Sequence, residues 1–178
     1  MSPSPGWTIC ESPIGPLTVV AGPGGIANIH FPGTSPRLPE AARQPLRPAV
    51  EQLEAYFAGK RQAFELDLDL RGTSFQREVW HQLLEISYGT TTTYGEVARK
   101  IDGSLYGPDV EPYERPRVVG TAIGRNPVPV VVPCHRVIGA DGSRTGYYGG
   151  LQRKRTLLEL EGWGASDPVP PEHQLAML

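Results

Sequence analysis

Cysteine is scarce in this chain, which has only Cys10 and Cys134 among its 178 residues. Two cysteines so far apart do not form the disulfide framework of a small secreted protein, so we predict a reducing, cytoplasmic setting. Metal-ligand spacing is also missing, because no Cys-x-x-Cys or His-x-x-x-His pattern occurs. We therefore expect no metal site.

Long apolar runs are absent as well, and the composition is 39% hydrophobic and 20% charged. Nothing in the sequence is apolar over the length that a bilayer requires. The opening residues, Met-Ser-Pro-Ser-Pro-Gly, lack the basic and apolar blocks of a secretory signal. The sequence predicts a soluble globular protein that is large enough to bury a core.

An excess of basic charge is missing too, since the formal net charge is −2. Overall charge therefore gives no reason to expect a general polyanion binder. Four acidic residues and no basic one lie in the stretch 102–114, namely Asp102, Asp109, Glu111 and Glu114. The rest of the C-terminal half is richer in basic residues, which fits a phosphate-facing surface beside an acidic loop or an ordinary mixed surface.

The N-terminal part has the pattern of a small α/β domain, for which we predict the bounds 1–72. Apolar segments at 7–10, 17–21 and 26–31 alternate with Gly/Pro turns, which is typical of an antiparallel meander. After a proline-rich connector, a helix is expected over 49–57, with Val50, Leu53 and Phe57 on its apolar face. Strict alternation over 64–70 predicts one more strand.

The C-terminal part, 73–163, is predicted to be mainly helical. Thr73 or Ser74 can cap a helix over 75–86, and Thr93 can cap another over 94–101. A third is expected from Pro116 to Arg125 and a fourth over 151–161. The second and third could form a helix-turn-helix, although a dozen linking residues is long for that motif. The proline-rich tail, 164–178, is expected to be mobile.

The chemistry concentrates at Cys134 and His135, which are adjacent. A thiol becomes a good nucleophile when a base removes its proton, and an imidazole is such a base. A buried, unreactive cysteine beside an unrelated histidine is the alternative. Three prolines in 126–133 predict a rigid extended strap before the cysteine, and 146–150 is a glycine-rich loop with two aromatic residues.

Several motifs together resemble the O6-alkylguanine-DNA alkyltransferase family. The C-terminal ones are Phe75-Gln-x-x-Val-Trp80, Thr93-Tyr-Gly-Glu96, Asn126-Pro-Val-Pro, Pro133-Cys-His-Arg-Val137, Gly146-Tyr-x-Gly-Gly150 and Leu157-Leu-x-x-Glu161-Gly162. Ser12-Pro-Ile-Gly-Pro-Leu17 and Tyr56-Phe-Ala-Gly59 extend the likeness into the N-terminal part. The resemblance implies a ribonuclease H-like N-terminal domain and a helix-turn-helix in the C-terminal domain.

The resemblance also implies a suicide repair protein without a cofactor. Such a protein binds double-stranded DNA through the minor groove, flips out an O6-alkylguanine and takes the alkyl group onto cysteine. O4-alkylthymine would be a further substrate. A monomer is expected, and cooperative binding to DNA stays open.

Residue roles follow from matching positions in the family. Cys134 would accept the alkyl group, His135 would deprotonate it through a bound water, and Glu161 would orient the imidazole. Asn126 would brace the site, Tyr94 would help to rotate the nucleotide, and Arg117 would fill the gap left by the flipped base. Further DNA-facing residues would be Val118, Gly120, Ala122 and Arg136. The substrate pocket would be formed by Pro129, Val137, Tyr147, Tyr148 and Gly149.

Two departures from the family pattern stand out. The chain between Tyr94 and Arg117 is about nine residues longer than usual, and the extra residues fall in the acidic stretch. We expect loop 102–115 to fold away from the duplex or to screen it. Tyr148 stands where a small residue is usual, and we expect it to change the preference between methyl and benzyl lesions.

Three other functions fit parts of the sequence. A non-catalytic, alkyltransferase-like lesion binder would lack the acceptor cysteine, which is present here. An unrelated cysteine transferase or hydrolase would turn over without binding a duplex. A transcriptional regulator that senses alkylation would need a further DNA-reading domain.

Overall fold

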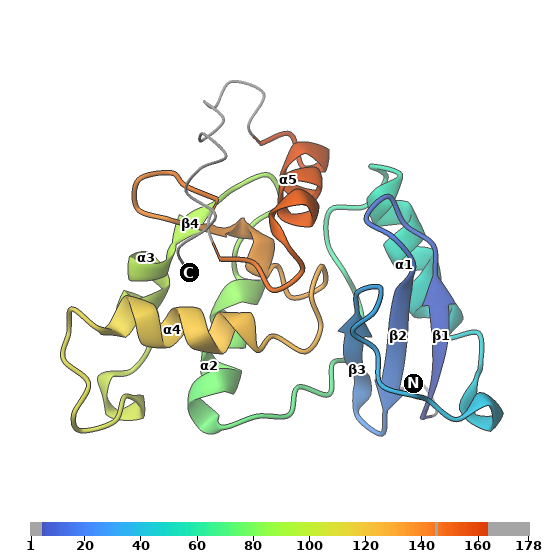
Figure 1. Cartoon of the computed structure of the whole chain (residues 1–178), viewed down its shortest axis with the longest axis horizontal. Helices are drawn as coiled ribbons and strands as arrows, with labels where there is room; N and C mark the ends of the chain where they lie inside the picture. Colours follow the sequence, from blue (N-terminus) through green and yellow to red (C-terminus); the bar gives the residue numbers. More distant parts are fainter. Residues whose placement is uncertain (1–4, 145, 164–178) are drawn as a thin grey trace.

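The computed structural model describes residues 5–144 and 146–163. A three-stranded sheet with one long helix lies beside a group of helices, and helix α5 lies at the junction of the two parts (Figure 1). The predicted tail, 164–178, lies outside the described residues. The fold therefore has an α/β part followed by a helical part, as predicted.

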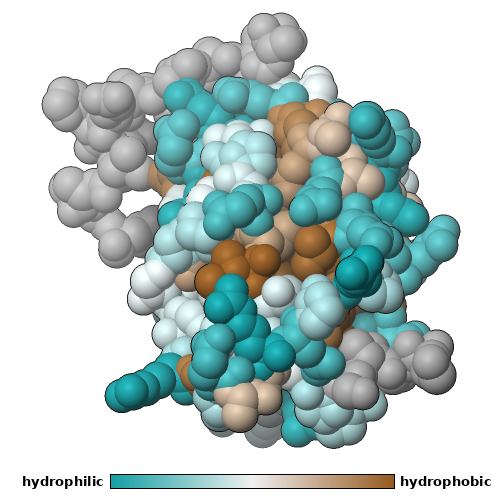
Figure 2. Space-filling model, turned by 90° about the vertical axis from the view of Figure 1, so that its right-hand side faces the viewer, coloured by the Kyte–Doolittle hydropathy of each residue, from teal (hydrophilic) through white to brown (hydrophobic). Residues whose placement is uncertain are grey.

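The sheet is an antiparallel meander in the order β1-β2-β3. Its strands are β1 (Gly6–Cys10), β2 (Leu17–Gly22) and β3 (Gly25–His30). Residues of β2 alternate between buried and half-buried, because one face of the sheet covers the core and the other does not. Figure 2 views the molecule from the side of these strands and shows hydrophobic surface at its centre, bordered by hydrophilic side chains.

Helix α1 (Arg47–Phe57) follows a short 3₁₀ turn, η1 (Glu40–Ala42). Its buried side chains are Ala49, Leu53 and Tyr56, whereas the predicted face had Val50, Leu53 and Phe57. Val50 and Phe57 pack at the edge of the core instead. The helix is thus rotated relative to the prediction so that a tyrosine points inward.

The strand predicted over 64–70 is wrong. Only Leu68 forms a bridge, to Ile26 of β3, through two backbone hydrogen bonds of 2.8 and 2.9 Å. Further along β3, the amide of Ile29 donates to the carbonyl of Pro127 at 2.9 Å. The outer edge of β3 is therefore shared between two segments, and neither extends into a strand.

The helical part contains short elements whose starts match the sequence signals. Thr73 and Gln76 form a capping box at one helix, and Thr93 and Glu96 form another. The elements are α2 (Ser74–Leu84), β4 (Thr92–Thr93), α3 (Tyr94–Lys100), η2 (Gly103–Leu105), α4 (Arg115–Gly124), η3 (Cys134–Arg136), β5 (Val137–Ile138) and α5 (Leu151–Leu160). Helices α2, α3 and α4 pack against one another. Within the described residues, no helix combines the length and apolarity needed to cross a membrane.

The inner half of the acidic loop is part of the core. Tyr106 is buried, its hydroxyl donates to the carbonyl of Ala98 at 2.9 Å, and its ring contacts Phe75. The guanidinium of Arg115 lies 4.7 Å from the centre of the same ring. The outer half is exposed, and the side chain of Tyr113 is 80% accessible. The loop is therefore anchored next to α4.

The strap before Cys134 is not extended, contrary to the prediction. Val130 adopts a left-handed backbone conformation with φ of 75°, which is unusual for a β-branched residue. The amide of Val132 donates to the carbonyl of Val128 at 2.9 Å, and Pro129 bridges Val132. The prolines rigidify a tight loop, and this loop delivers the cysteine into the interior.

Candidate active site

Cys134 is the first residue of the turn η3, and it is buried. Its amide donates to the carbonyl of Val132 at 2.8 Å. Asn126 holds the preceding loop from both sides: its Nδ2 donates to the carbonyl of Val132 at 2.8 Å, and its Oδ1 accepts from the amide of Val128 at 3.0 Å. The bracing position predicted for Asn126 is therefore present in the geometry.

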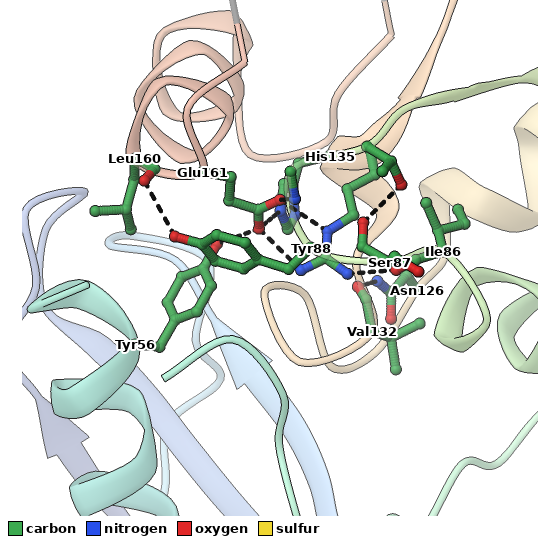
Figure 3. Close-up of polar contacts among 12 residues, drawn as sticks. Tyr56, Ile86, Ser87, Tyr88, Asn126, Val132, His135, Leu160 and Glu161 are labelled. Atoms are coloured by element: carbon green, nitrogen blue, oxygen red, sulfur yellow. Dashed lines mark hydrogen bonds and ion pairs between the residues drawn. The ribbon is translucent and has the colours of Figure 1, made fainter. Parts of the chain in front are cut away.

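His135 and Glu161 are in direct contact at the end of α5, with 2.8 Å between His135 Nε2 and Glu161 Oε1 (Figure 3). His135 is fully buried. Its Nδ1 is also buried and has no hydrogen-bond partner among the described residues. With Nε2 donating to the carboxylate, Nδ1 carries the lone pair that can accept a proton.

Arg136 was predicted to face DNA, and this prediction is wrong. The side chain is buried, its Nε and Nη2 each donate to Glu161 at 2.9 Å, and its Nη1 donates to the carbonyl of Ile86 at 2.5 Å. A guanidinium can match a carboxylate with two parallel hydrogen bonds, which makes it a suitable buried partner for Glu161. Its function here is charge compensation.

Two further donors complete the surroundings of Glu161. The hydroxyl of Tyr56 donates to Oε1 at 2.7 Å, and the amide of Gly89 donates to Oε2 at 3.1 Å. Gly89 has φ of 72°, and a Cβ there would lie 3.0 Å from the backbone oxygen of Glu161. We call the set Tyr56, Gly89, His135, Arg136 and Glu161 the Glu161 cluster.

The Glu161 cluster sets the charge states of its members. Burial alone would raise the pKa of Glu161, but hydrogen bonds from His135 and Arg136 outweigh it and bring the pKa to about 2. Burial lowers the pKa of His135, and Glu161 opposes that effect. The carboxylate is therefore charged and the imidazole neutral near pH 7, which is the state a base needs.

The thiol of Cys134 requires such a base. Burial raises its pKa, and this effect exceeds the opposing influences of the Asn126 amide, the Lys154 charge, its own backbone and the Tyr147 hydroxyl. Lys154 is fully buried on α5 and donates to the carbonyl of Val137 at 2.6 Å. Burial lowers the pKa of Lys154 to about 8, whereas a charge on Cys134 would raise it.

A small pocket lies against the sulfur, with free space of about 10 Å³. It is lined by Phe31, Ile123, Gly124, Asn126, Pro129, Cys134, Gly146, Tyr147, Tyr148 and Gly149. Four of the five predicted pocket residues are among them. Val137, the fifth, is buried next to the turn and contributes its carbonyl to Lys154.

The two tyrosines of the loop 146–150, which lines the pocket, have different environments. The Tyr147 hydroxyl is buried without a hydrogen bond of normal geometry among the described residues, yet it is near enough to lower the pKa of Cys134. Tyr148 is 67% accessible and lies at the mouth. Gly149 is packed tightly, since a Cβ would lie 2.5 Å from the Phe31 ring.

An open groove of about 610 Å³ runs outward from this mouth. Its lining includes Tyr94, Arg117, Gly120 and Tyr148. The side chain of Arg117 is 84% accessible, and its Nη2 lies 3.9 Å from Glu114. The hydroxyl of Tyr94 donates to the carbonyl of Gly146 at 3.0 Å, so α3 touches the loop that covers the pocket.

Two of the other predicted DNA-facing residues have different environments. Val118 is half-buried beside Arg117 in a second groove, next to Thr121. Ala122 is 3% accessible, and its carbonyl accepts from Trp80 Nε1 at 2.9 Å. Ala122 nevertheless lines the same second groove as Arg117 and Val118, so its place on the DNA-facing side stays a prediction.

Sequence reasoning missed Tyr56, Gly89 and Lys154. A helical spacing of three from Leu53 points to Tyr56, and a lysine among the apolar positions Leu157 and Leu158 of α5 was a visible signal. Nothing local distinguishes Gly89. Among the described residues, no group of three or more histidine, cysteine or acidic side chains could hold a metal ion.

Comparison with known proteins gives matches along most of the chain. Residues 6–70 match the family model described as "6-O-methylguanine DNA methyltransferase, ribonuclease-like domain". Residues 74–163 match the model described as "6-O-methylguanine DNA methyltransferase, DNA binding domain".

Curated relatives and solved structures agree with these models. Proteins named methylated-DNA–protein-cysteine methyltransferase are 48% identical in Mycobacterium tuberculosis, over 85% of this chain and 88% of the relative, and 42% identical in Methanosarcina acetivorans, over 88% and 97%. A crystal structure of M. tuberculosis OGT-R37K covers 94% of this chain and 98% of its own, at 41% identity and a TM-score of 0.73. The structure of M. tuberculosis OGT in complex with DNA covers 87% and 91%, at 46% identity and the same TM-score. The chain belongs to the O6-methylguanine DNA methyltransferase family.

Proposed function

We propose that this protein repairs DNA by moving the alkyl group of O6-alkylguanine onto Cys134, once per molecule. The observation that carries the proposal is that Cys134 lines a pocket and is followed by His135, whose ring contacts the charged Glu161. The family membership supports the substrate class, because relatives carry the name methylated-DNA–protein-cysteine methyltransferase. O4-alkylthymine is a second substrate in this proposal.

The reaction begins with proton removal. Through a water, His135 Nδ1 accepts the proton of the Cys134 thiol, while Glu161 holds the imidazole through Nε2. Lys154 favours the thiolate electrostatically. The sulfur then attacks the alkyl carbon, the carbon–oxygen bond breaks, and its electron pair stays with the guanine oxygen.

The leaving group becomes guanine by taking a proton from a phenol, which we assign to Tyr94; the tyrosine regains a proton from solvent, to which His135 releases the one that it took from Cys134. A thioether is stable in water, so the modified cysteine is not regenerated. Tyr147 and Pro129 form walls around the alkyl group, and backbone groups of Tyr148 contact the guanine edge.

DNA reaches the site through the open groove in this proposal. Helices α3 and α4 act as a helix-turn-helix, with the exposed Arg117 replacing the flipped base in the stack. Phosphate and minor-groove contacts come from this face, which includes Gly120 and Val118. We place the boundary between the two domains at 72/73 and expect the protein to act as a monomer.

The test is the intact mass of the protein after incubation with an O6-methylguanine duplex. We expect a stoichiometric gain of one methyl group on the peptide that contains Cys134, absent in Cys134→Ala. Cys10→Ala is the matched control, because burial raises the pKa of Cys10 to about 11, with Glu54 and Glu11 adding to the effect. Repeated turnover, or binding without methyl transfer, would contradict the proposal.

A further inference from the structure

One member of the Glu161 cluster comes from the other part of the chain. Tyr56 lies on α1, 105 residues before Glu161, and is fully buried. Its hydroxyl donates to Glu161 Oε1 at 2.7 Å, and this is the oxygen that also contacts His135 Nε2 (Figure 3). The N-terminal part therefore reaches the oxygen that orients the base.

The ring of Tyr56 is held on three sides. Phe57, Phe64 and Tyr88 have ring centres at 5.2, 5.3 and 6.1 Å from it. Burial, followed by the charge of Glu161, raises the pKa of Tyr56, so the hydroxyl stays protonated and can only donate in this contact. A fixed donor of this kind restricts both the position and the charge density of the carboxylate.

The effect on His135 follows from the groups that surround the pair. Burial is the largest influence against a positive imidazole; Glu161 favours the positive ring, and the charges of Arg136 and Lys154 disfavour it. Tyr88 faces the carboxylate from the loop after α2, where Gly89 donates its amide. The Tyr56 hydroxyl donates to Oε1 and disperses part of the negative charge of Glu161. The carboxylate then stabilises a positive imidazole less, which favours the neutral ring of His135.

We propose that Tyr56 is a positioning residue for alkyl transfer: its hydroxyl fixes Glu161 and moderates this carboxylate, so that His135 stays a neutral base. The proposal rests on the function proposed above. In it, the N-terminal domain contributes to the reaction through one hydrogen bond, in addition to packing.

The variant that isolates this hydrogen bond is Tyr56→Phe, which keeps the ring. Tyr88→Phe is the matched control. The hydroxyl of Tyr88 donates to the carbonyl of Leu160 at 3.1 Å and not to the carboxylate of Glu161. Each variant loses one tyrosine hydroxyl that bonds the end of α5: Tyr56 does so from the N-terminal part, and Tyr88 does so within the C-terminal part. Thermal unfolding of both variants measures how much stability each lost hydroxyl costs, separately from any effect on His135.

The first measurement is the pH titration of the His135 ring by NMR, assigned with His135→Gln. We expect Tyr56→Phe to raise the pKa of His135 by roughly half a unit, and Tyr88→Phe to leave it in place. An unchanged titration in Tyr56→Phe, or equal shifts in the two variants, would overturn the proposal. This readout needs no DNA, so it decides about Tyr56 even if the wild type transfers no methyl group and the proposed function fails.

The second measurement is the single-turnover rate of methyl transfer against pH, at saturating O6-methylguanine duplex. In Tyr56→Phe the acid limb should move to higher pH by the same amount as the ring titration, with duplex affinity unchanged. A fall in rate that is uniform across pH would indicate a purely structural role and would overturn the proposal.

Discussion

His135 and Glu161 lie 26 residues apart in the sequence and 2.8 Å apart in the structure, at the centre of a buried cluster. The contact occupies one ring nitrogen of His135 and leaves the other without a partner among the described residues. The partner of the histidine in the structure is thus Glu161 and not its neighbour in sequence, Cys134; in the proposed reaction, Cys134 uses the remaining ring nitrogen.

Replacing Glu161 by glutamine should destabilise the fold and slow the reaction together. The change leaves the buried Arg136 without its counter-charge, which costs about 3–5 kcal/mol in the free energy of unfolding. Loss of the orienting carboxylate should slow methyl transfer about a hundredfold or more. Denaturant unfolding and single-turnover kinetics measure the two effects.

Glu159→Gln is the control for that variant. Glu159 lies in the last turn of α5, just before Glu161, but its side chain is 56% exposed and pairs with Arg155 at 3.7 Å. We expect a change in stability within about 0.5 kcal/mol and an unaltered rate. Equal behaviour of the two variants would contradict the assignment of Glu161.

Lys154→Met should raise the pKa of the Cys134 thiol. The lysine charge lies in a buried setting, where it favours the thiolate more than it would in water. We expect an increase of about one unit and a transfer rate at neutral pH about tenfold lower. Thiolate absorbance against pH measures the first quantity, and Arg155→Met, on the half-exposed side of α5, is the control. A thiol pKa that stays the same would count against this electrostatic effect.

Tyr148→Gly should change lesion preference. The side chain is 67% exposed at the mouth of the pocket, so its removal widens access for large alkyl groups more than for a methyl group. We expect the ratio of benzyl to methyl transfer rates to rise. Tyr113→Gly, which removes an exposed tyrosine from the acidic loop, should leave that ratio unchanged; identical relative rates in wild type and Tyr148→Gly would refute the prediction.

Glu114→Gln should strengthen binding to duplex DNA at low salt. Glu114 lies 3.9 Å from Arg117 at the start of α4, so it screens the exposed guanidinium. Exposed pairs are worth about 0.2–1 kcal/mol, which corresponds to an affinity gain of at most about fivefold. Titrations at several salt concentrations measure it, with Glu51→Gln on α1 as control. A gain that persists at high salt would indicate another cause.

Local signals explain most of what the sequence predicted correctly. Thr73 and Thr93 begin helices because each cap and its partner lie within one turn, so the necessary contacts are visible in the sequence. The meander is similar, because its strands are joined by short turns. The contact between His135 and Glu161 was expected too, although from the family resemblance and not from a local signal.

Contacts between distant residues account for the errors. The strand at 64–70 failed because part of the edge of β3 is bonded to Pro127. Arg136 was expected to face DNA because of the family resemblance, and only the fold brings it to Glu161. The inward turn of Tyr56 likewise depends on a carboxylate from the last helix.

The parallel pairing of β4 with β5 has a consequence for how this protein can change during evolution. Thr92 and Thr93 pair with Val137 and Ile138, the residues that follow the reactive turn. The position of α3 relative to Cys134 is therefore fixed by backbone hydrogen bonds and does not depend on the number of residues between them. Insertions such as the acidic loop can accumulate between α3 and α4 without moving the sulfur, so surface loops near the DNA can diversify while the chemistry is preserved.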